Sequence, residues 1–227
     1  MGKGDEEILR VSRTKDQAKQ AYDSLSRIYD YLIGIFEKKY KHRGLELLGV
    51  RKGEKVLEIG YGTGDILVQI AEKVGVRGKA YGIDISSGML NVAESKVEKA
   101  GIADRVEFFL GDAVKLPYED NKFDAAFMSF TLELFDTPEI PVILNEIKRV
   151  LRSGGRLGVV SISREYGKPL ALRLYEWLHK KIPKYADCRP IYVEKALKAS
   201  GYQIQHMEKA HLFGLPIIIT TATIMTN

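Results

Sequence analysis

Short apolar runs alternate along this chain with segments whose apolar residues recur at helical spacing. Seven runs are predicted to be strands, at residues 56–59, 79–84, 105–110, 123–130, 155–163, 202–209 and 216–225. Helical spacing predicts helices at 63–74, 86–100, 138–151, 169–182 and 191–200. Strands that alternate with helices in this way indicate an α/β fold with a doubly wound sheet.

One long amphipathic helix is predicted before the first strand. Thr14 and Gln17 have the spacing of a capping box, in which each side chain bonds the other residue's backbone. Apolar residues then recur every three or four positions from Ala18 to Phe36.

A glycine-dense turn joins the first strand to the next helix, in the run Val56-Leu-Glu-Ile-Gly-Tyr-Gly-Thr-Gly-Asp65. Such a turn lets the backbone approach a ligand closely. Asp65 stands where a dinucleotide fingerprint has its third glycine, which argues against NAD. Glu58 precedes the turn, and Asp84 ends the second strand where a ribose would be held.

These features, with Gly111-Asp112-Ala113 after the third strand, resemble the S-adenosylmethionine site of the class I methyltransferases. The resemblance implies a Rossmann-like, mostly parallel sheet of seven strands with the last strand antiparallel, plus a helical cap. It also implies that Asp112 accepts a hydrogen bond from the adenine amino group and that Met89 packs on the adenine ring. The implied cofactor-binding residues are Glu58, Gly60, Tyr61, Gly62, Thr63, Gly64, Asp84, Ile85, Met89, Asp112, Ala113 and Ser129.

Two flanking segments, 22–30 and 127–135, are similar to the ubiquinone/menaquinone biosynthesis methyltransferases. The chain departs from them after the fourth strand, where Leu132-Glu133-Leu134 replaces their usual Arg-Asn pair. The acceptor therefore stays open between a small hydrophobic molecule such as a prenylated quinone and a phospholipid ethanolamine headgroup. A cofactor-binding module without turnover is the third interpretation.

The candidate acid/base residues are Glu133, expected at the carboxyl end of the fourth strand, and His179, on the predicted helix 169–182. A solvated loop carboxylate and a partly buried helix histidine are the alternative interpretations. Six residues are expected to line the acceptor pocket, namely Tyr22, Tyr29, Phe130, Tyr175, Cys188 and Arg189. An aromatic stripe such as Tyr22 and Tyr29 is also typical of a helix packed on a core.

The chain has 227 residues, of which 45% are hydrophobic, enough to form a substantial core. We expect a helical lid segment at 1–50 and a methyltransferase core at 51–227 with a cap insertion around 164–190. The net charge of +5 comes from 35 basic residues interleaved with 30 acidic ones, which indicates a solvated surface and not a nucleic-acid footprint.

A single cysteine and the absence of a Cys/His cluster in the sequence predict no metal site and fit a reducing cytoplasm. The amino terminus lacks an apolar export segment, and no apolar run reaches the roughly eighteen residues of a membrane span. The expected location is the cytoplasm, with peripheral membrane contact through the amphipathic helices.

Overall fold

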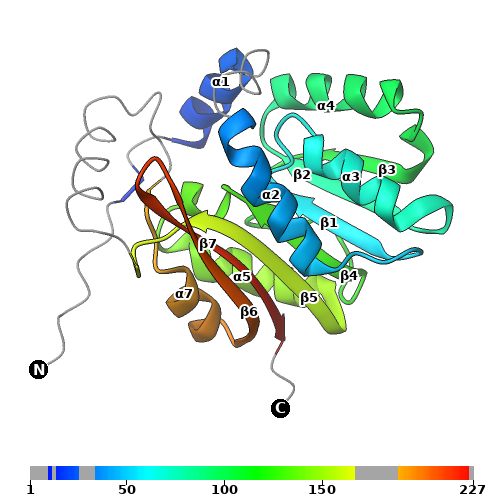
Figure 1. Cartoon of the computed structure of the whole chain (residues 1–227). Coiled ribbons are helices and arrows are strands. Elements are labelled where there is room, and N and C mark those ends of the chain that lie inside the picture. Colours follow the sequence, from blue (N-terminus) through cyan, green and yellow to red (C-terminus); the bar gives the residue numbers. More distant parts are fainter. Residues whose placement is uncertain (1–9, 12–13, 26–33, 167–188, 225–227) are drawn as a thin grey trace, which may run out of the picture.

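The computed structural model describes residues 10–11, 14–25, 34–166 and 189–224. Seven strands form one sheet in the order β3-β2-β1-β4-β5-β7-β6 (Figure 1). Their bounds are β1 Lys55–Ile59, β2 Lys79–Asp84, β3 Val106–Leu110, β4 Phe123–Ser129, β5 Leu151–Ile162, β6 Tyr202–Leu212 and β7 Leu215–Ile224. The first five strands pair in parallel, while β7 runs antiparallel to both β5 and β6. The predicted Rossmann-like fold is confirmed.

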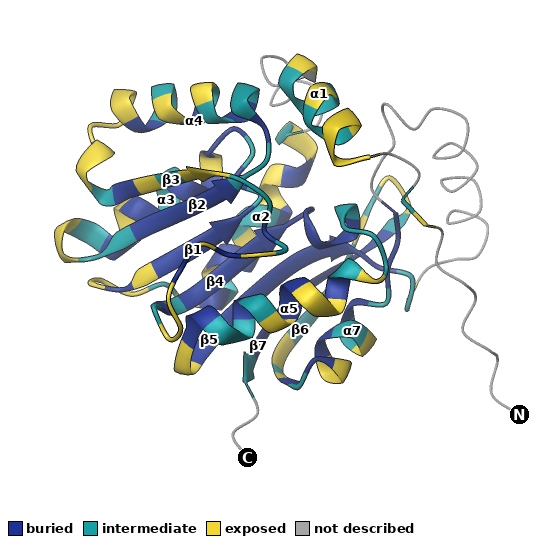
Figure 2. Cartoon of the chain, turned by 180° about the vertical axis from the view of Figure 1, so that it is seen from behind, coloured by how far each residue is buried: buried dark blue, intermediate teal, exposed yellow. Residues whose placement is uncertain are grey.

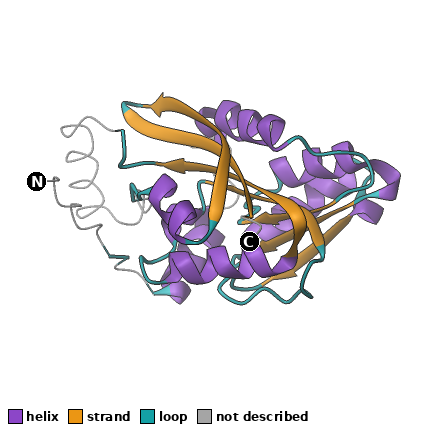
Figure 3. Ribbon diagram, turned by 90° about the horizontal axis from the view of Figure 1, so that it is seen from below, coloured by secondary structure: helices purple, strands orange, loops and turns teal. Residues whose placement is uncertain are grey.

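Helices cover both faces of the sheet (Figure 3). The helices are α1 Lys15–Leu25, α2 Ile35–Leu48, α3 Asp65–Val74, α4 Ser87–Lys99, α5 Glu139–Val150 and α7 Val193–Ala199. One face carries α2, α3 and α4, and the other carries α5 and α7. The buried strands between these layers appear dark blue in Figure 2.

Alternation along each strand divides the apolar residues between two cores. Val56 packs into the core beneath α2 and α3, whereas Leu57 and Ile59 pack into the core beneath α5. Burying a side chain of this size stabilises the fold by about 1.5–3 kcal/mol. The central strands are therefore a rigid base for the turns that follow their carboxyl ends.

The capping box at the start of α1 is confirmed. The Thr14 amide donates to Gln17 Oε1 over 2.9 Å, and the Gln17 amide donates to Thr14 Oγ1 over 3.3 Å. The helix that was predicted to run as far as Phe36 includes residues 26–33, which lie outside the described residues. Phe36, assigned there to the apolar face, belongs to α2 and is exposed.

The sequence interpretation missed the role of α2, which packs closely on the sheet. A Cβ at Gly44 would lie 2.4 Å from Val160 Cγ2, so a glycine lets the helix approach β5. Leu45 and Leu48 are buried in the core that it shares with α3. The division of the chain at residue 50 stays a prediction, although α2 of the preceding segment packs into the core.

At the junction of α5 and β5 the helix ends within one residue of the predicted 151, but the strand begins earlier than the predicted 155. The helix ends at Val150, and the strand begins at Leu151. The register against β4 then shifts by several residues, with Gly154 at a φ of 72°. The glycines therefore form a bulge within the strand, because their backbone accepts this geometry.

Candidate functional site

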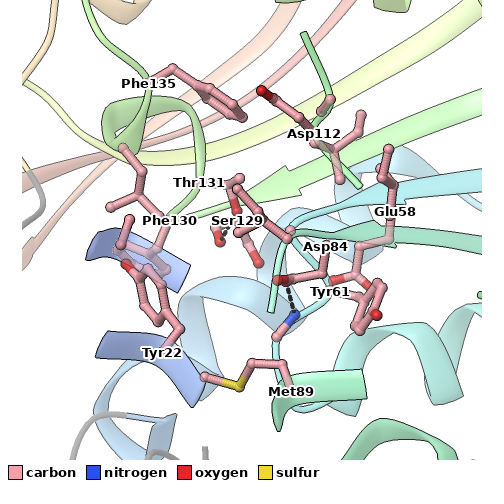
Figure 4. A pocket seen from close by; sticks show the side chains of 18 of the residues that line it. Tyr22, Glu58, Tyr61, Asp84, Met89, Asp112, Ser129, Phe130, Thr131 and Phe135 are labelled. Carbon is pink, nitrogen blue, oxygen red and sulfur yellow. Dashed lines mark hydrogen bonds between the residues drawn. The ribbon is translucent and has the colours of Figure 1, made fainter. Parts of the chain in front are cut away.

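A cavity of about 550 Å³ lies where β1, β2, β3 and β4 end (Figure 4). Ligands of open α/β sheets bind at this edge, where the chain turns from strand to helix. The cavity is lined by eleven of the twelve residues assigned to a cofactor, namely Glu58, Gly60, Tyr61, Gly62, Thr63, Asp84, Ile85, Met89, Asp112, Ala113 and Ser129. The structure thus brings together residues that lie far apart in the sequence.

The glycines of the turn differ in what surrounds them. A Cβ at Gly60 would lie 2.4 Å from Thr131 Oγ1, and one at Gly64 would lie 2.7 Å from Ala93 Cβ. Gly62 lines the cavity, and within the described part of the chain no heavy atom lies within 4 Å of its Cβ position. At Gly60 and Gly64 the absence of a side chain therefore serves packing, whereas at Gly62 it leaves space for a ligand.

Three acidic side chains reach the cavity from three successive strands. Asp84 is tied to the glycine turn, since its Oδ2 accepts from the Gly62 amide over 2.9 Å. Burial raises the pKa of Asp84, although backbone hydrogen bonds oppose the shift. Glu58 is buried, and its Oε2 has no hydrogen-bond partner among the described residues. Burial also raises the pKa of Glu58 well above its ordinary value.

The third carboxylate, Asp112, is covered by α1. Its Oδ2 lies 2.5 Å from Lys15 Nζ, which also lies 2.6 Å from Glu139 Oε1. Its Oδ1 accepts from the Val114 amide over 3.0 Å. A lysine of the covering helix therefore sits at the carboxylate that the resemblance assigns to adenine.

Further contacts fix α1 across the cavity. Asp23 accepts from Ser86 Oγ over 2.6 Å and from the Gly88 amide over 2.8 Å, at the start of α4. Before the helix, Arg10 pairs with Asp136 over 2.6 Å. Tyr22 lines the cavity from the same helix.

The wall contributed by α2 was missed from the sequence. Lys38, Lys41 and His42 line the cavity at the helical spacing of three and four residues. Lys41 Nζ lies 2.7 Å from the buried Glu37 and 5.8 Å from the centre of the Phe130 ring. Their helical spacing was a detectable signal, but the predicted helix ended at Phe36.

Phe130 lines the cavity directly after β4 in a strained conformation. Its φ is 53°, in the left-handed region that a phenylalanine rarely adopts. Its amide donates to the Val160 carbonyl over 2.7 Å, and its side chain is buried. Backbone strain of this kind persists where the surrounding structure holds the residue in place, as at binding sites.

Glu133 and Arg189 lie behind the cavity wall. Glu133, in the short 3-10 helix Leu132–Leu134, accepts from Ser161 Oγ over 2.8 Å and from the Ile162 amide over 3.1 Å. Burial raises its pKa to about 7. Arg189 is also buried and donates to Thr137 Oγ1 over 3.1 Å. Neither side chain is among the described residues that line the cavity. Glu133 and Arg189 therefore do not lie where a contact with the acceptor was expected.

Four predicted site residues, Tyr29, Tyr175, His179 and Cys188, lie outside the described residues, as does the predicted cap helix 169–182.

Within the described ranges no group of His, Cys, Asp and Glu side chains is arranged to hold a metal ion. In the same ranges, no helix combines the length and apolar character needed to cross a bilayer.

Comparison with known families places residues 5–191 within the model of the ubiE/COQ5 methyltransferase family. The chain is 37% identical over 154 residues to the demethylmenaquinone methyltransferase of Staphylococcus aureus strain JH9, and the match covers 66% of this chain. The matched region spans 62% of the length of that relative, and the same holds for the enzyme of strain Newman.

Solved structures share the fold. A SAM-dependent methyltransferase from Aquifex aeolicus superposes with a TM-score of 0.62 at 25% identity, covering 94% of this chain and 100% of the other. The [4+2]-cyclase SpnF superposes with a TM-score of 0.77 at 21% identity, covering 95% and 98% of the two chains. The fold is thus found with more than one chemistry, and function has to be argued from the site.

Proposed function

The chain belongs to the ubiE/COQ5 methyltransferase family, and we propose that it transfers a methyl group from S-adenosylmethionine to a small hydrophobic acceptor that reacts as an anion. A prenylated quinol is an acceptor of this kind. The observation that carries the proposal is one cavity with carboxylates from three strand ends on one side and a cationic helix wall on another.

The residues present fit S-adenosylmethionine. Asp84 would hold the ribose hydroxyls, and Asp112 would accept from the adenine amino group once Lys15 withdraws. The unpartnered Glu58 Oε2 is the acceptor that a ligand ammonium group requires, because a buried carboxylate without a donor is unfavourable. Open space over Gly62 leaves room for the ligand against the backbone.

The α2 wall favours an anionic acceptor. Lys38 and Lys41 bring positive charge to the cavity, although Lys41 Nζ lies 2.7 Å from the buried Glu37 as well as near the ring of Phe130. A nearby cation stabilises an ionised hydroxyl over its neutral form, whereas it disfavours a protonated amine. This charge supports a phenol-like or quinol-like acceptor over an ethanolamine headgroup.

When bound, S-adenosylmethionine supplies an electrophilic methyl group, so the protein's part is largely positioning. Lys41 would stabilise the acceptor oxyanion, which makes the adjacent ring carbon nucleophilic. That carbon would take the methyl group, with neutral S-adenosylhomocysteine as the leaving group, and would then pass its proton to water.

His42 is our candidate to orient the acceptor. It lines the cavity, and its Nε2 accepts from the Gln69 side-chain amide over 2.9 Å, so the neutral ring carries its hydrogen on Nδ1, where it can donate to the acceptor oxygen. For Glu133 we propose a positioning role, since its carboxylate holds the loop after β4 against β5.

The test has two parts. Calorimetry with S-adenosylhomocysteine should show binding that Asp84→Ala weakens by a factor of about 30 to 150, the loss expected for a two-point contact with a charged acceptor. Labelled S-adenosylmethionine should then transfer methyl groups to a reduced, short-chain demethylmenaquinone. Transfer to phosphatidylethanolamine alone would establish the headgroup alternative, and binding without transfer to either acceptor would favour a non-catalytic module.

A further inference from the structure

The hairpin between β6 and β7 ends in an unusual turn. Leu212 pairs with Leu215, so Phe213 and Gly214 form a two-residue loop. Their φ angles are 51° and 83°, the left-handed values for which such turns prefer Asn-Gly. Phe213 is also 76% exposed, so the chain accepts both backbone strain and an exposed aromatic ring at one position.

Phe213 belongs to an exposed apolar patch that we call the hairpin patch, defined by Ile35, Phe36 and Phe213. The rings of Phe36 and Phe213 meet edge to face with centroids 4.9 Å apart. Ile35 is 60% exposed and Phe36 47% exposed. Tyr40 donates to the His211 carbonyl over 2.5 Å, which ties the hairpin to α2.

Cationic residues flank the hairpin patch on α2. Lys38 and Lys39 lie two and three residues after Phe36, and both are exposed. Nearby acidic residues are paired, Glu37 with Lys41 and Glu208 with Arg43. Apolar side chains flanked by lysines are suited to bind an anionic lipid bilayer, in which negatively charged headgroups cover an apolar interior.

The hairpin patch adjoins the cavity through α2. Gly34 and Lys38 line the cavity, and Ile35 and Phe36 lie between them in the sequence. The first turn of α2 therefore has one side on the cavity and another in the patch.

We propose that the hairpin patch inserts into the headgroup region of an anionic phospholipid bilayer and brings the cavity mouth to a lipid-borne acceptor. This inference rests on the proposed function for the acceptor, while the binding itself is independent of turnover. Phe213 is the membrane anchor, and the lysines provide a salt-sensitive attraction.

The test is flotation of the full chain with vesicles of phosphatidylglycerol and phosphatidylcholine in equal parts. Phe213→Asn should lower the vesicle partition coefficient about tenfold, because one buried aromatic ring is lost. Val76→Asn is the matched control, since Val76 is 79% exposed and precedes β2, in the half of the sheet away from the β6–β7 hairpin. The control should bind as the unmodified chain does, and binding should weaken as salt is added.

Thermal unfolding separates this role from a structural one. Phe213→Asn creates the favoured Asn-Gly turn, so its melting temperature should be equal to or above that of the unmodified chain. Its affinity for S-adenosylhomocysteine should be unchanged. Turnover should fall for an acceptor embedded in vesicles but not for a water-soluble analogue.

Unchanged flotation of Phe213→Asn would overturn the proposal, as would failure of the unmodified chain to float. Self-association that the substitution abolishes, without vesicle binding, would instead identify an interface between copies of this chain. Because cofactor binding is measured separately, a failure of the proposed function would appear there and not in flotation.

Discussion

At the scale of single residues, neighbouring positions of one motif have different physical roles. Gly60 and Gly64 avoid collisions with Thr131 and Ala93, whereas Gly62 faces the cavity. The carboxylate of Glu133, which was expected at the reacting atoms, instead accepts hydrogen bonds from Ser161 and Ile162 of β5. A side chain's surroundings decide its role, and the substitutions below test two of these assignments.

Gly62→Ala should lower S-adenosylhomocysteine affinity at least tenfold, because the added methyl group enters ligand space. The matched control is Gly49→Ala, since Gly49 has a similar φ of 64° and likewise nothing within 4 Å of its Cβ position in the described structure. Both variants should lose about 1 kcal/mol of stability from backbone strain. Calorimetry that shows equal affinity for the two would remove Gly62 from the ligand contacts.

Glu133→Gln should change how stability depends on pH. Burial raises the pKa of Glu133 from an ordinary 4.5 to about 7, so the folded state retains a proton that the unfolded state has lost between these values. The stabilising contribution of this proton is complete below the unfolded pKa and is lost as pH rises through about 7, by about 3 kcal/mol in total. Relative to Glu133→Gln, the unmodified chain should lose stability over this window.

The measurement for Glu133 is urea denaturation from about pH 4 to about pH 8. The exposed Glu119→Gln serves as the control for the same chemical change at the surface. A constant difference for Glu133→Gln would show that folding does not shift the pKa of Glu133.

At the scale of elements, the two amino-terminal helices have different functions. α2 is built into the sheet packing and presents a cationic face to the cavity. α1 lies across the cavity and is attached through polar contacts at Lys15 and Asp23. Exposed ion pairs are weak, so we expect α1 to act as a cover that a ligand can shift.

Lys15→Met should raise S-adenosylhomocysteine affinity up to about fivefold, because Asp112 no longer has to exchange a lysine for the adenine amino group. Lys79→Met is the control, since Lys79 forms a comparable exposed pair with Glu107 outside the residues lining the cavity. A fall in affinity for Lys15→Met, with Lys79→Met unchanged, would show that Lys15 contacts the ligand directly.

At the scale of the whole molecule, a rigid sheet carries a site whose cover is less firmly held. β1 and β4 are buried between helix layers, so their amides should exchange with solvent only through global unfolding. The amides of α1 should exchange faster and gain protection when S-adenosylhomocysteine is added. Hydrogen exchange by mass spectrometry checks this, and equal protection of α1 with and without the ligand would show that it is no lid.

The sequence by itself determined the order of strands and helices, the glycine turn and the carboxylates at the strand ends. These features follow from local periodicity and from the rule that parallel strands end at one edge, so no knowledge of distant contacts was needed. The described core helices and strands accordingly lie close to their predicted bounds.

Only the tertiary structure decided which side chains share the cavity. Lys41 reaches it because Gly44 lets α2 lie against β5, and Glu133 turns away because Ser161 and the Ile162 amide satisfy its carboxylate. The strain at Phe130 and the pairing of Lys15 with Asp112 likewise depend on partners distant in the chain. The sequence pattern shows which helix or strand a residue belongs to and which face it lies on. The contacts of its side chain are decided only when the helices and strands pack together.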